Sequence, residues 1–330
     1  MLRATEWPGG PDDTVLLSAN GDDAKDKALL DDPHAPTGWR NSGEFRQYGR
    51  RWFILFIISF LQISNAILWI TFAPIIVVSR NHYAATETQI NMLSMIFMIA
   101  FIPLGFPASW ALNTWGLRKS VCVFAALNFV GGWVRFIAEF SDEPHIRYGV
   151  VFFGQTLAAI AQPVIVDCPT LMAATWFSET QRAEANTIAS VSNPIGIGVG
   201  SVIAALMVVV PADMFNLLWV VALPPTIALV LVLFCLSNKP PTPPSPSAEL
   251  PTYDFRLGVK TVLCNKMFLL LIFSFGVGIG VISTFTTVMA QITAGQGYND
   301  DDARLVPLAC GGQWAPGGPP MSPGGLRQLP

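Results

Sequence analysis

The sequence predicts an all-α protein that crosses a lipid bilayer several times. Hydrophobic residues make up 52% of its 330 residues and charged residues only 12%, whereas a soluble domain carries about 25% charged residues. The mean hydropathy is +0.48, and long apolar runs recur along the chain. A helix of about 20 residues, rising ~1.5 Å per residue, crosses a hydrocarbon layer of roughly 30 Å. These features exclude a soluble globular domain.

The first apolar run begins directly after Arg50 and Arg51 and carries polar residues at mid-depth, among them Gln62 and Asn65. An unpaired amide is costly in a membrane interior. We therefore expect this first span to line something polar. Further apolar runs follow it. The predicted spans are residues 52–79, 91–112, 119–139, 148–170, 187–210, 216–236 and 267–293.

These spans divide the chain into parts of different character. We expect residues 46–236 to form a six-helix half, 237–266 a proline-rich cytosolic linker and 267–293 a seventh transmembrane helix. Residues 1–45 are polar and acidic and lack the apolar segment of a signal peptide, which predicts a disordered cytosolic tail. Residues 294–330 hold no apolar window, which favours an altered carboxyl end, from splicing or a shifted reading frame, over a natural extracellular tail.

Lysine and arginine placement predicts the orientation of the spans, because these residues concentrate on cytosolic loops. Arg80 and Arg147 flank the spans on one side. The opposite set of loops carries Arg46, Arg50, Arg51, Arg118, Lys119, Arg182, Lys239, Arg256, Lys260 and Lys266. We therefore expect a multi-pass protein with a cytosolic amino terminus, in the plasma membrane or an endolysosomal membrane. Asp12 with Leu16 and Leu17 matches an acidic dileucine sorting pattern, although such short patterns also arise by chance.

The loop between the second and third predicted spans reads ASWALNTWGLRK. Gly116, Arg118 and Lys119 match the signature loop of the major facilitator superfamily, whereas Asn113 stands at its acidic position and Ser109 at its first glycine. That loop holds helix ends together while the transporter changes conformation. An ordinary basic cytosolic turn is the alternative.

Six spans followed by a cytosolic linker and a further span also resemble this superfamily, in which two six-helix halves enclose a site near the bilayer midplane. The fold class that we expect is therefore an all-α polytopic membrane protein. It would consist of the amino-terminal six-helix half of the major facilitator fold plus one further transmembrane helix.

Longer stretches carry a closer resemblance. They are RRWFILFIISFLQISNAILWITFAP, INMLSMIFMIAFIPLGFPASWALNTWGLR, GQTLAAIAQPVIVDCPTLMAATWF, QRAEANTIASVSNPIGIGVGSVIAAL and GVGIGVISTFTTVMAQI. In this order they resemble the feline leukaemia virus subgroup C receptor-related family, also called solute carrier family 49, over residues 46–298. The resemblance implies transport of choline or ethanolamine, historically of haem, and in one lysosomal branch of a pyridoxine-type substrate.

The resemblance also suggests site residues. Trp69 aligns with an aromatic residue that forms part of a cage for a quaternary ammonium in choline-handling relatives, and a cation–π contact contributes about 0.5–2 kcal/mol. A helix-four glutamine of the family aligns with Gln162, and Asn65 is the other residue expected to face substrate. The second cage aromatic has no counterpart because Ser283 stands near its position, so choline specificity does not carry over unchanged. The alternatives are a packing role for Trp69 and interhelical hydrogen bonding by Asn65 and Gln162.

Charged residues also lie inside the predicted spans. Arg135 and Glu139 are four residues apart on the third span, where they are expected to pair on one helix face. Asp167 lies toward the cytosolic end of the fourth span and has three interpretations. It is a latch to Arg118 that replaces the acid missing at Asn113, a proton- or cation-coupling carboxylate, or a solvated helix end.

The sequence does not support catalysis or nucleotide binding. Glycine-rich runs at residues 196–200 and 276–280 lie within apolar spans, so they predict close helix packing rather than a dinucleotide site. The scattered cysteines match no metal or disulfide pattern. We expect no enzyme activity, no cofactor, no metal and no nucleic-acid partner.

Two functional hypotheses follow. The first is a facilitator-type transporter that moves a small organic cation or metabolite by alternating access, with the lipid bilayer and a small-molecule substrate as its partners. The second is a truncated, transport-inactive membrane protein that acts only by binding partners, such as its full-length counterpart.

Overall fold

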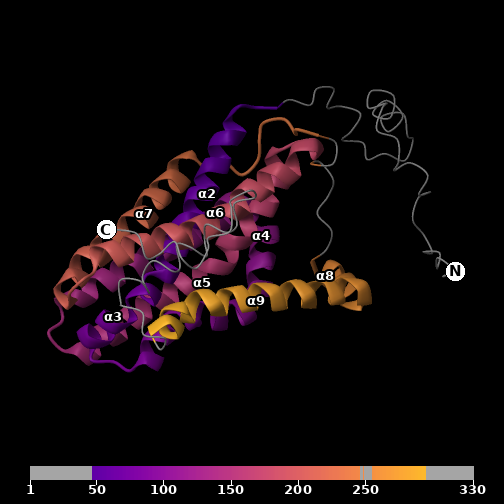
Figure 1. Cartoon of the computed structure of the whole chain (residues 1–330). Coiled ribbons are helices and arrows are strands. Elements are labelled where there is room, and N and C mark those ends of the chain that lie inside the picture. The colour runs from indigo at the N-terminus through magenta and orange to yellow at the C-terminus, as the bar shows by residue number, and fades with distance from the viewer. Residues whose placement is uncertain (1–46, 246–247, 249–254, 295–330) are drawn as a thin grey trace, which may run out of the picture. The chain divides into compact units, whose positions relative to one another are not determined.

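The computed structural model describes residues 47–245, 248 and 255–294, and these residues form helices and connecting turns without a strand (Figure 1). This confirms the predicted all-α class. The predicted amino-terminal tail and nearly all of the predicted carboxyl-terminal tail lie outside the described residues. The elements are α2 (Arg50–Ile70), η3 (Ala73–Ile75), α3 (Ile76–Tyr83), α4 (Glu87–Ile137), η4 (Ala138–Phe140), α5 (Pro144–Trp176), α6 (Glu179–Met207), η5 (Pro211–Asp213), α7 (Met214–Cys235), α8 (Phe255–Cys264) and α9 (Lys266–Ala294).

Within the described residues, five helical segments are long and apolar enough to cross a membrane, and the bent pair of α8 and α9 would add a sixth. One of the five, Glu87–Phe140, is 54 residues long, which as a straight helix would measure about 80 Å. The chain instead reverses at Gly116, whose φ of 79° is not helical. The Ser120 hydroxyl accordingly donates to the Ala111 carbonyl at 2.9 Å. α4 therefore makes two passes, as the separate spans predicted from the sequence require.

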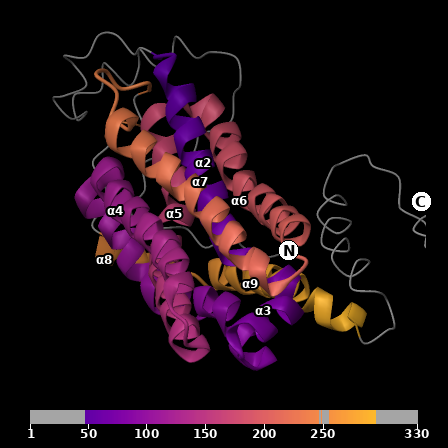
Figure 2. The same ribbon diagram turned by 90° about the vertical axis from the view of Figure 1, so that its left-hand side faces the viewer.

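α2 lies at the centre of the packed helices. It contacts α4, α5, α6 and α7, and both views show it running alongside α6 and α7 (Figure 1 and Figure 2). Its first half, from Ile54 to Leu61, belongs to one apolar cluster, and its last turn from Ile67 belongs to another. The polar residues between the two clusters, Gln62, Ser64 and Asn65, are no more than 1% exposed. The first span thus carries buried polar groups at mid-length, as the sequence predicted.

α6 approaches α2 closely because glycines face the contact. A Cβ atom at Gly196 would lie 2.8 Å from the Cα and carbonyl oxygen of Ile63, and one at Gly200 would lie 2.7 Å from Cγ2 of Ile70. Gly198, two residues away on the same helix, has open space around it. Small residues four apart are a common means of close contact between membrane helices.

The last part of the predicted linker contains a helix that the sequence analysis did not separate from it. After the prolines end, residues 255–264 form α8, and the chain then turns by 85° into α9. Asn265 lies between the two helices, and its side-chain oxygen accepts the backbone N–H groups of Met267 and Phe268 at 3.1 and 3.3 Å. This cap supplies an acceptor for backbone N–H groups at the start of α9 that have no helical partner. The predicted seventh helix therefore begins at a defined residue.

The contact between α2 and α6 leads to a stability prediction. Replacement Gly196→Ala places a methyl group against the α2 backbone, and we expect it to lower the free energy of unfolding by about 1–3 kcal/mol, as overpacking does. Gly198→Ala is the matched control, because the same change meets open space there. Thermal unfolding of the purified variants in one detergent measures both. Equal melting temperatures for the two variants would contradict the close contact.

Candidate functional site

The first membrane span is interrupted in its last third. α2 ends at Ile70, a short 3₁₀ turn covers Ala73–Ile75, and the helix resumes as α3. Pro74 has no backbone N–H to offer to Ile70, the residue four positions earlier. A helix end leaves carbonyl groups without helical partners, and inside an apolar layer these need other donors. The interruption therefore creates a polar position between the helices.

The Leu68 carbonyl obtains its donors from two other helices. The Nη1 atom of Arg135 on α4 and the Nε2 atom of Gln155 on α5 each donate to it at 3.1 Å. We call these two side chains and the Leu68 carbonyl the polar centre. All of its side chains are fully buried. The polar centre joins three helices at the point where the first span breaks.

Arg135 carries the charge of the polar centre and has few partners there. Its guanidinium carbon lies 4.9 Å from the centroid of the Phe72 ring, a cation–π contact. Its Nε and Nη2 atoms are buried without a hydrogen-bond partner, as is Oε1 of Gln155. Gly154 makes room for Arg135, because a Cβ atom there would lie 2.9 Å from Cγ of Arg135. The polar centre therefore holds a buried positive charge that is only partly satisfied.

The predicted pairing of Arg135 with Glu139 is wrong. Glu139 instead accepts hydrogen bonds from Tyr83 at 3.1 Å and lies 2.8 Å from Nε2 of His82. The physical reason is a change of helix geometry, because α4 gives way to a 3₁₀ turn at Ala138. Four residues no longer bring two side chains onto one face when the turn tightens. Arg135 points to the first span, and Glu139 points to the end of α3.

Asn65 makes the interhelical hydrogen bonds that the sequence analysis left open as an alternative. Its Nδ2 atom donates to Oδ1 of Asn128 on α4 at 2.9 Å and to the Ala158 carbonyl on α5 at 3.2 Å. Asn128 in turn donates to the Ser64 hydroxyl at 3.4 Å. Oδ1 of Asn65 is buried without a partner. This network ties three helices together and leaves one acceptor unused.

Trp69 and Gln162 differ in their surroundings. Trp69 is 4% exposed, its indole N–H donates to the Ser94 carbonyl at 3.1 Å, and its ring centroid lies 6.5 Å from that of Phe97. Gln162 is 6% exposed and has no hydrogen bond to another described residue. Trp69 is therefore held against the first pass of α4, whereas the Gln162 amide keeps its hydrogen-bonding groups available.

The predicted signature loop contacts two other helices. Ser109 donates to Oδ2 of Asp167 at 3.3 Å, and the Asn113 amide donates to the Ser109 carbonyl at 3.0 Å. Arg118 reaches α7, with Nη2 donating to the Leu233 carbonyl at 3.4 Å. No ion pair joins Asp167 to Arg118 among the described residues. Lys119 is exposed.

Some residues of this region were missed by sequence reasoning. Asn128 and Gln155 received no role, although each is a lone amide in an apolar run, which is a signal for a buried polar contact. Tyr83 and His82 were missed because they end a short helix with no distinctive spacing. The part of the chain that the structure describes contains no group of three His, Cys, Asp or Glu side chains able to hold a metal ion.

Comparison with known proteins gives the family. A family model described as Major Facilitator Superfamily matches residues 47–323. The chain belongs to the major facilitator superfamily. Its helical arrangement resembles the crystal structure of a D-xylose-proton symporter, with a TM-score of 0.54 and 15% identity over 78% of this chain and 64% of that one. A bacterial homologue of the human lysosomal transporter Spinster gives a TM-score of 0.55 and 14% identity over 81% and 60%. These two likenesses concern the fold.

Curated relatives confirm the resemblance to solute carrier family 49. Solute carrier family 49 member A3 of Xenopus tropicalis is 36% identical over 78% of this chain and 55% of its own length. The protein of the same name from Danio rerio is 35% identical over 82% and 58%. A choline/ethanolamine transporter of Danio rerio is 30% identical over 75% and 54%. The chain thus spans about half the length of these relatives.

The incomplete bonding of Arg135 leads to a prediction about stability. We expect Arg135→Met to keep or raise the free energy of unfolding, by up to about 1 kcal/mol, because it removes a buried charge while filling similar volume. Gln155 still serves the Leu68 carbonyl in that variant. Arg135→Ala also removes the charge but leaves a void, so its melting temperature should fall. Similar losses in both variants would show that the guanidinium itself stabilises the fold.

Proposed function

We propose that this protein is a solute transporter of the major facilitator type that works by alternating access. Its substrate is a small organic cation or metabolite, of the choline or ethanolamine class, with haem as the other substrate that the family resemblance implies. The match of the family model over residues 47–323 carries this proposal. Relatives named as choline/ethanolamine transporters support the substrate class.

The protein is a multi-pass integral membrane protein, and the orientation is part of the proposal. The distribution of lysine and arginine supports a cytosolic amino terminus. The plasma membrane and an endolysosomal membrane are the candidate locations. In this arrangement residues 46–236 are the transporter half, residues 237–266 the cytosolic linker and residues 267–293 the first helix of the second half.

Within this proposal the site residues have distinct roles. Trp69 supplies the aromatic face for a cation, and Gln162, with its unused amide, supplies hydrogen bonds to the substrate. Asn65 contributes its free Oδ1 acceptor while its Nδ2 holds the helices together. The residues of the signature loop, together with the α5 carboxylate that Ser109 contacts, hold the helix ends together during the conformational change. They are Asn113, Gly116, Arg118, Lys119 and Asp167.

A membrane protein without transport activity of its own is the second candidate function. Such a protein would act by binding a partner, and a full-length counterpart is the partner that the resemblance suggests. The interface would be the helices that face the second half in a complete transporter.

Uptake by reconstituted protein distinguishes the two candidates. Vesicles that contain the purified 330-residue chain should take up labelled choline in a saturable way if the first proposal holds. Trp69→Ala should reduce uptake at low substrate concentration about tenfold. This factor corresponds to the loss of roughly 1.4 kcal/mol from a desolvated cation–π contact. Trp69→Phe should retain part of it. Trp219→Ala, at a 44% exposed position on α7, is the matched control, and absence of uptake of any tested solute would leave the second candidate.

The interpretation of Asp167 as a coupling carboxylate has its own test. Asp167→Asn keeps the acceptor that Ser109 contacts but removes the charge and the proton-binding group. If Asp167 couples proton movement to transport, the variant should lose the pH dependence of uptake, while Ser109→Ala should keep it. An unchanged pH profile in Asp167→Asn would exclude coupling and leave a latch or a solvated helix end.

A further inference from the structure

Arg135 has one edge of its guanidinium group that no side chain or carbonyl of the described residues contacts. The Nη1 atom donates to the Leu68 carbonyl, whereas Nε and Nη2 are buried without a hydrogen-bond partner. Nε and Nη2 form one edge of the guanidinium plane, and their N–H bonds point the same way. Such an edge meets the two oxygens of a carboxylate in a bidentate contact. Arg135 therefore offers the edge by which an arginine recognises an acidic group.

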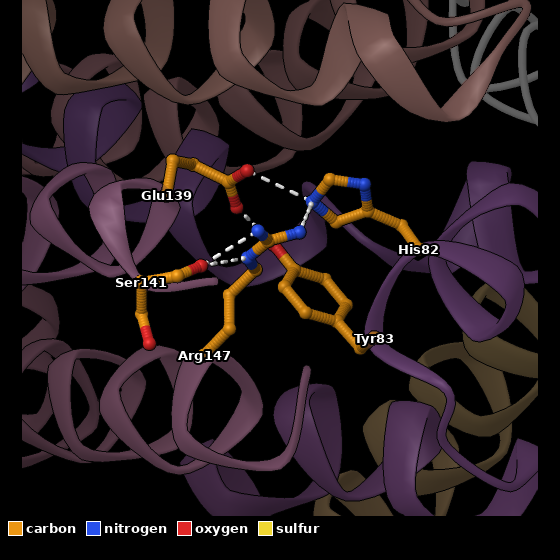
Figure 3. Close-up of polar contacts among 5 residues, drawn as sticks. All are labelled: His82, Tyr83, Glu139, Ser141 and Arg147. Carbon is orange, nitrogen blue, oxygen red and sulfur yellow. Dashed lines mark hydrogen bonds and ion pairs between the residues drawn. The ribbon is translucent and has the colours of Figure 1, made fainter. Parts of the chain in front are cut away.

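The acidic side chains of the neighbouring helices contact other groups. Glu139 follows Arg135 by four residues, but its two oxygens contact His82 and Tyr83 of α3 (Figure 3). Asp167 lies twelve residues beyond Gln155 on α5, which is roughly 18 Å along a helix. Among the described residues, no carboxylate forms an ion pair with Arg135.

Arg135 lies beside the peptide group of Trp69. The Leu68 carbonyl that it binds belongs to the peptide bond between Leu68 and Trp69. Arg135 is on the second pass of α4, after the reversal at Gly116, whereas Trp69 contacts Ser94 and Phe97 of the first pass. A movement of the first pass that uncovers the Trp69 ring therefore leaves Arg135 attached to the Leu68 carbonyl.

The charge of Arg135 affects which cations can bind near Trp69. Like charges repel more strongly where water is excluded, and an arginine side chain keeps its charge in a protein. A substrate that carries only an ammonium group is repelled by this guanidinium. A substrate that also carries a carboxylate compensates the repulsion and supplies the acceptors for Nε and Nη2. The surroundings of Trp69 thus favour a substrate with both charges.

We propose that the polar centre is a second part of the substrate site and that the substrate is a small zwitterion. Its ammonium group lies at Trp69, and its carboxylate accepts hydrogen bonds from Nε and Nη2 of Arg135. The unpartnered Oδ1 of Asn65, one helical turn before Trp69, is an acceptor suited to the positive end. This inference rests on the proposed transport function and narrows its substrate class.

Three probes of matched chemistry test the proposal. Glycine betaine and carnitine carry the trimethylammonium group of choline together with a carboxylate, which is nearer to the nitrogen in glycine betaine. Calorimetry measures the binding of each probe to the full 330-residue chain in lipid nanodiscs. We expect at least one zwitterion to bind about tenfold more tightly than choline, because it adds hydrogen bonds between charged groups. Choline binding as tightly as both zwitterions overturns the proposal.

Variants of Arg135 identify the group that causes the preference. Arg135→Met should abolish the preference for a zwitterion, because the bidentate edge is lost. Arg135→Lys keeps the charge but not the edge, so it should reduce the preference and serves as the test if Arg135→Met does not fold. Arg80→Gln removes a cation whose side chain is 45% exposed, and as the control it should keep the preference. A preference that survives in both Arg135 variants overturns the proposal.

The same measurements separate this inference from the proposed function. Trp69→Ala should weaken the binding of all three probes by a similar factor, because all three share the trimethylammonium group. Saturable choline uptake without any preference for a zwitterion rejects the inference and leaves cation transport standing. Tight binding of a zwitterion that depends on Arg135, in a chain that takes up none of the probes, supports the site and rejects transport by this chain. Binding of none of the probes overturns the inference.

Discussion

The first span is interrupted between Ile70 and Ile76, and the neighbouring helices must supply hydrogen-bond donors at that break. In an apolar layer, a backbone carbonyl that loses its helical partner needs another donor. The Leu68 carbonyl obtains two, from Arg135 and Gln155. Those side chains reach it only because α4 and α5 approach each other at Gly131 and Gly154, where no side chain intervenes. The break, the buried arginine and the glycine contact are therefore one structural unit.

Hydropathy was sufficient to predict where the long apolar helices of the described residues lie, because each pass needs an apolar run of a fixed length, but it did not predict the short helix α8. Hydropathy also predicted that the chain reverses near Gly116, where a basic loop separates two apolar runs. It missed the break in the first span, since Pro74 does not lower the average apolarity of the run around it. The Arg135 and Glu139 pairing failed for another reason. A pairing inferred from spacing along one helix assumes regular helical geometry and takes no account of side chains from distant segments. Here His82 and Tyr83 contact the Glu139 carboxylate instead.

The candidate site was predictable only in part. Trp69 and Gln162 came from a family resemblance, whereas the network of Asn65 depends on Asn128 and the Ala158 carbonyl, which lie far away in the sequence. No local pattern encodes such a contact. In the structure, Nδ2 of Asn65 joins the helices while its Oδ1 remains without a partner. A structural role and a substrate role are therefore compatible in that residue.

The burial of Trp69 sets a condition on any cation that binds there. A cation–π contact needs an open ring face, but Trp69 is 4% exposed and lies against Phe97. Its indole N–H is also bonded to the Ser94 carbonyl. Ser94 and Phe97 both belong to the first pass of α4. Rocking of two rigid halves would leave these contacts unchanged, so substrate contact at Trp69 requires the first pass of α4 to move relative to α2 within this half.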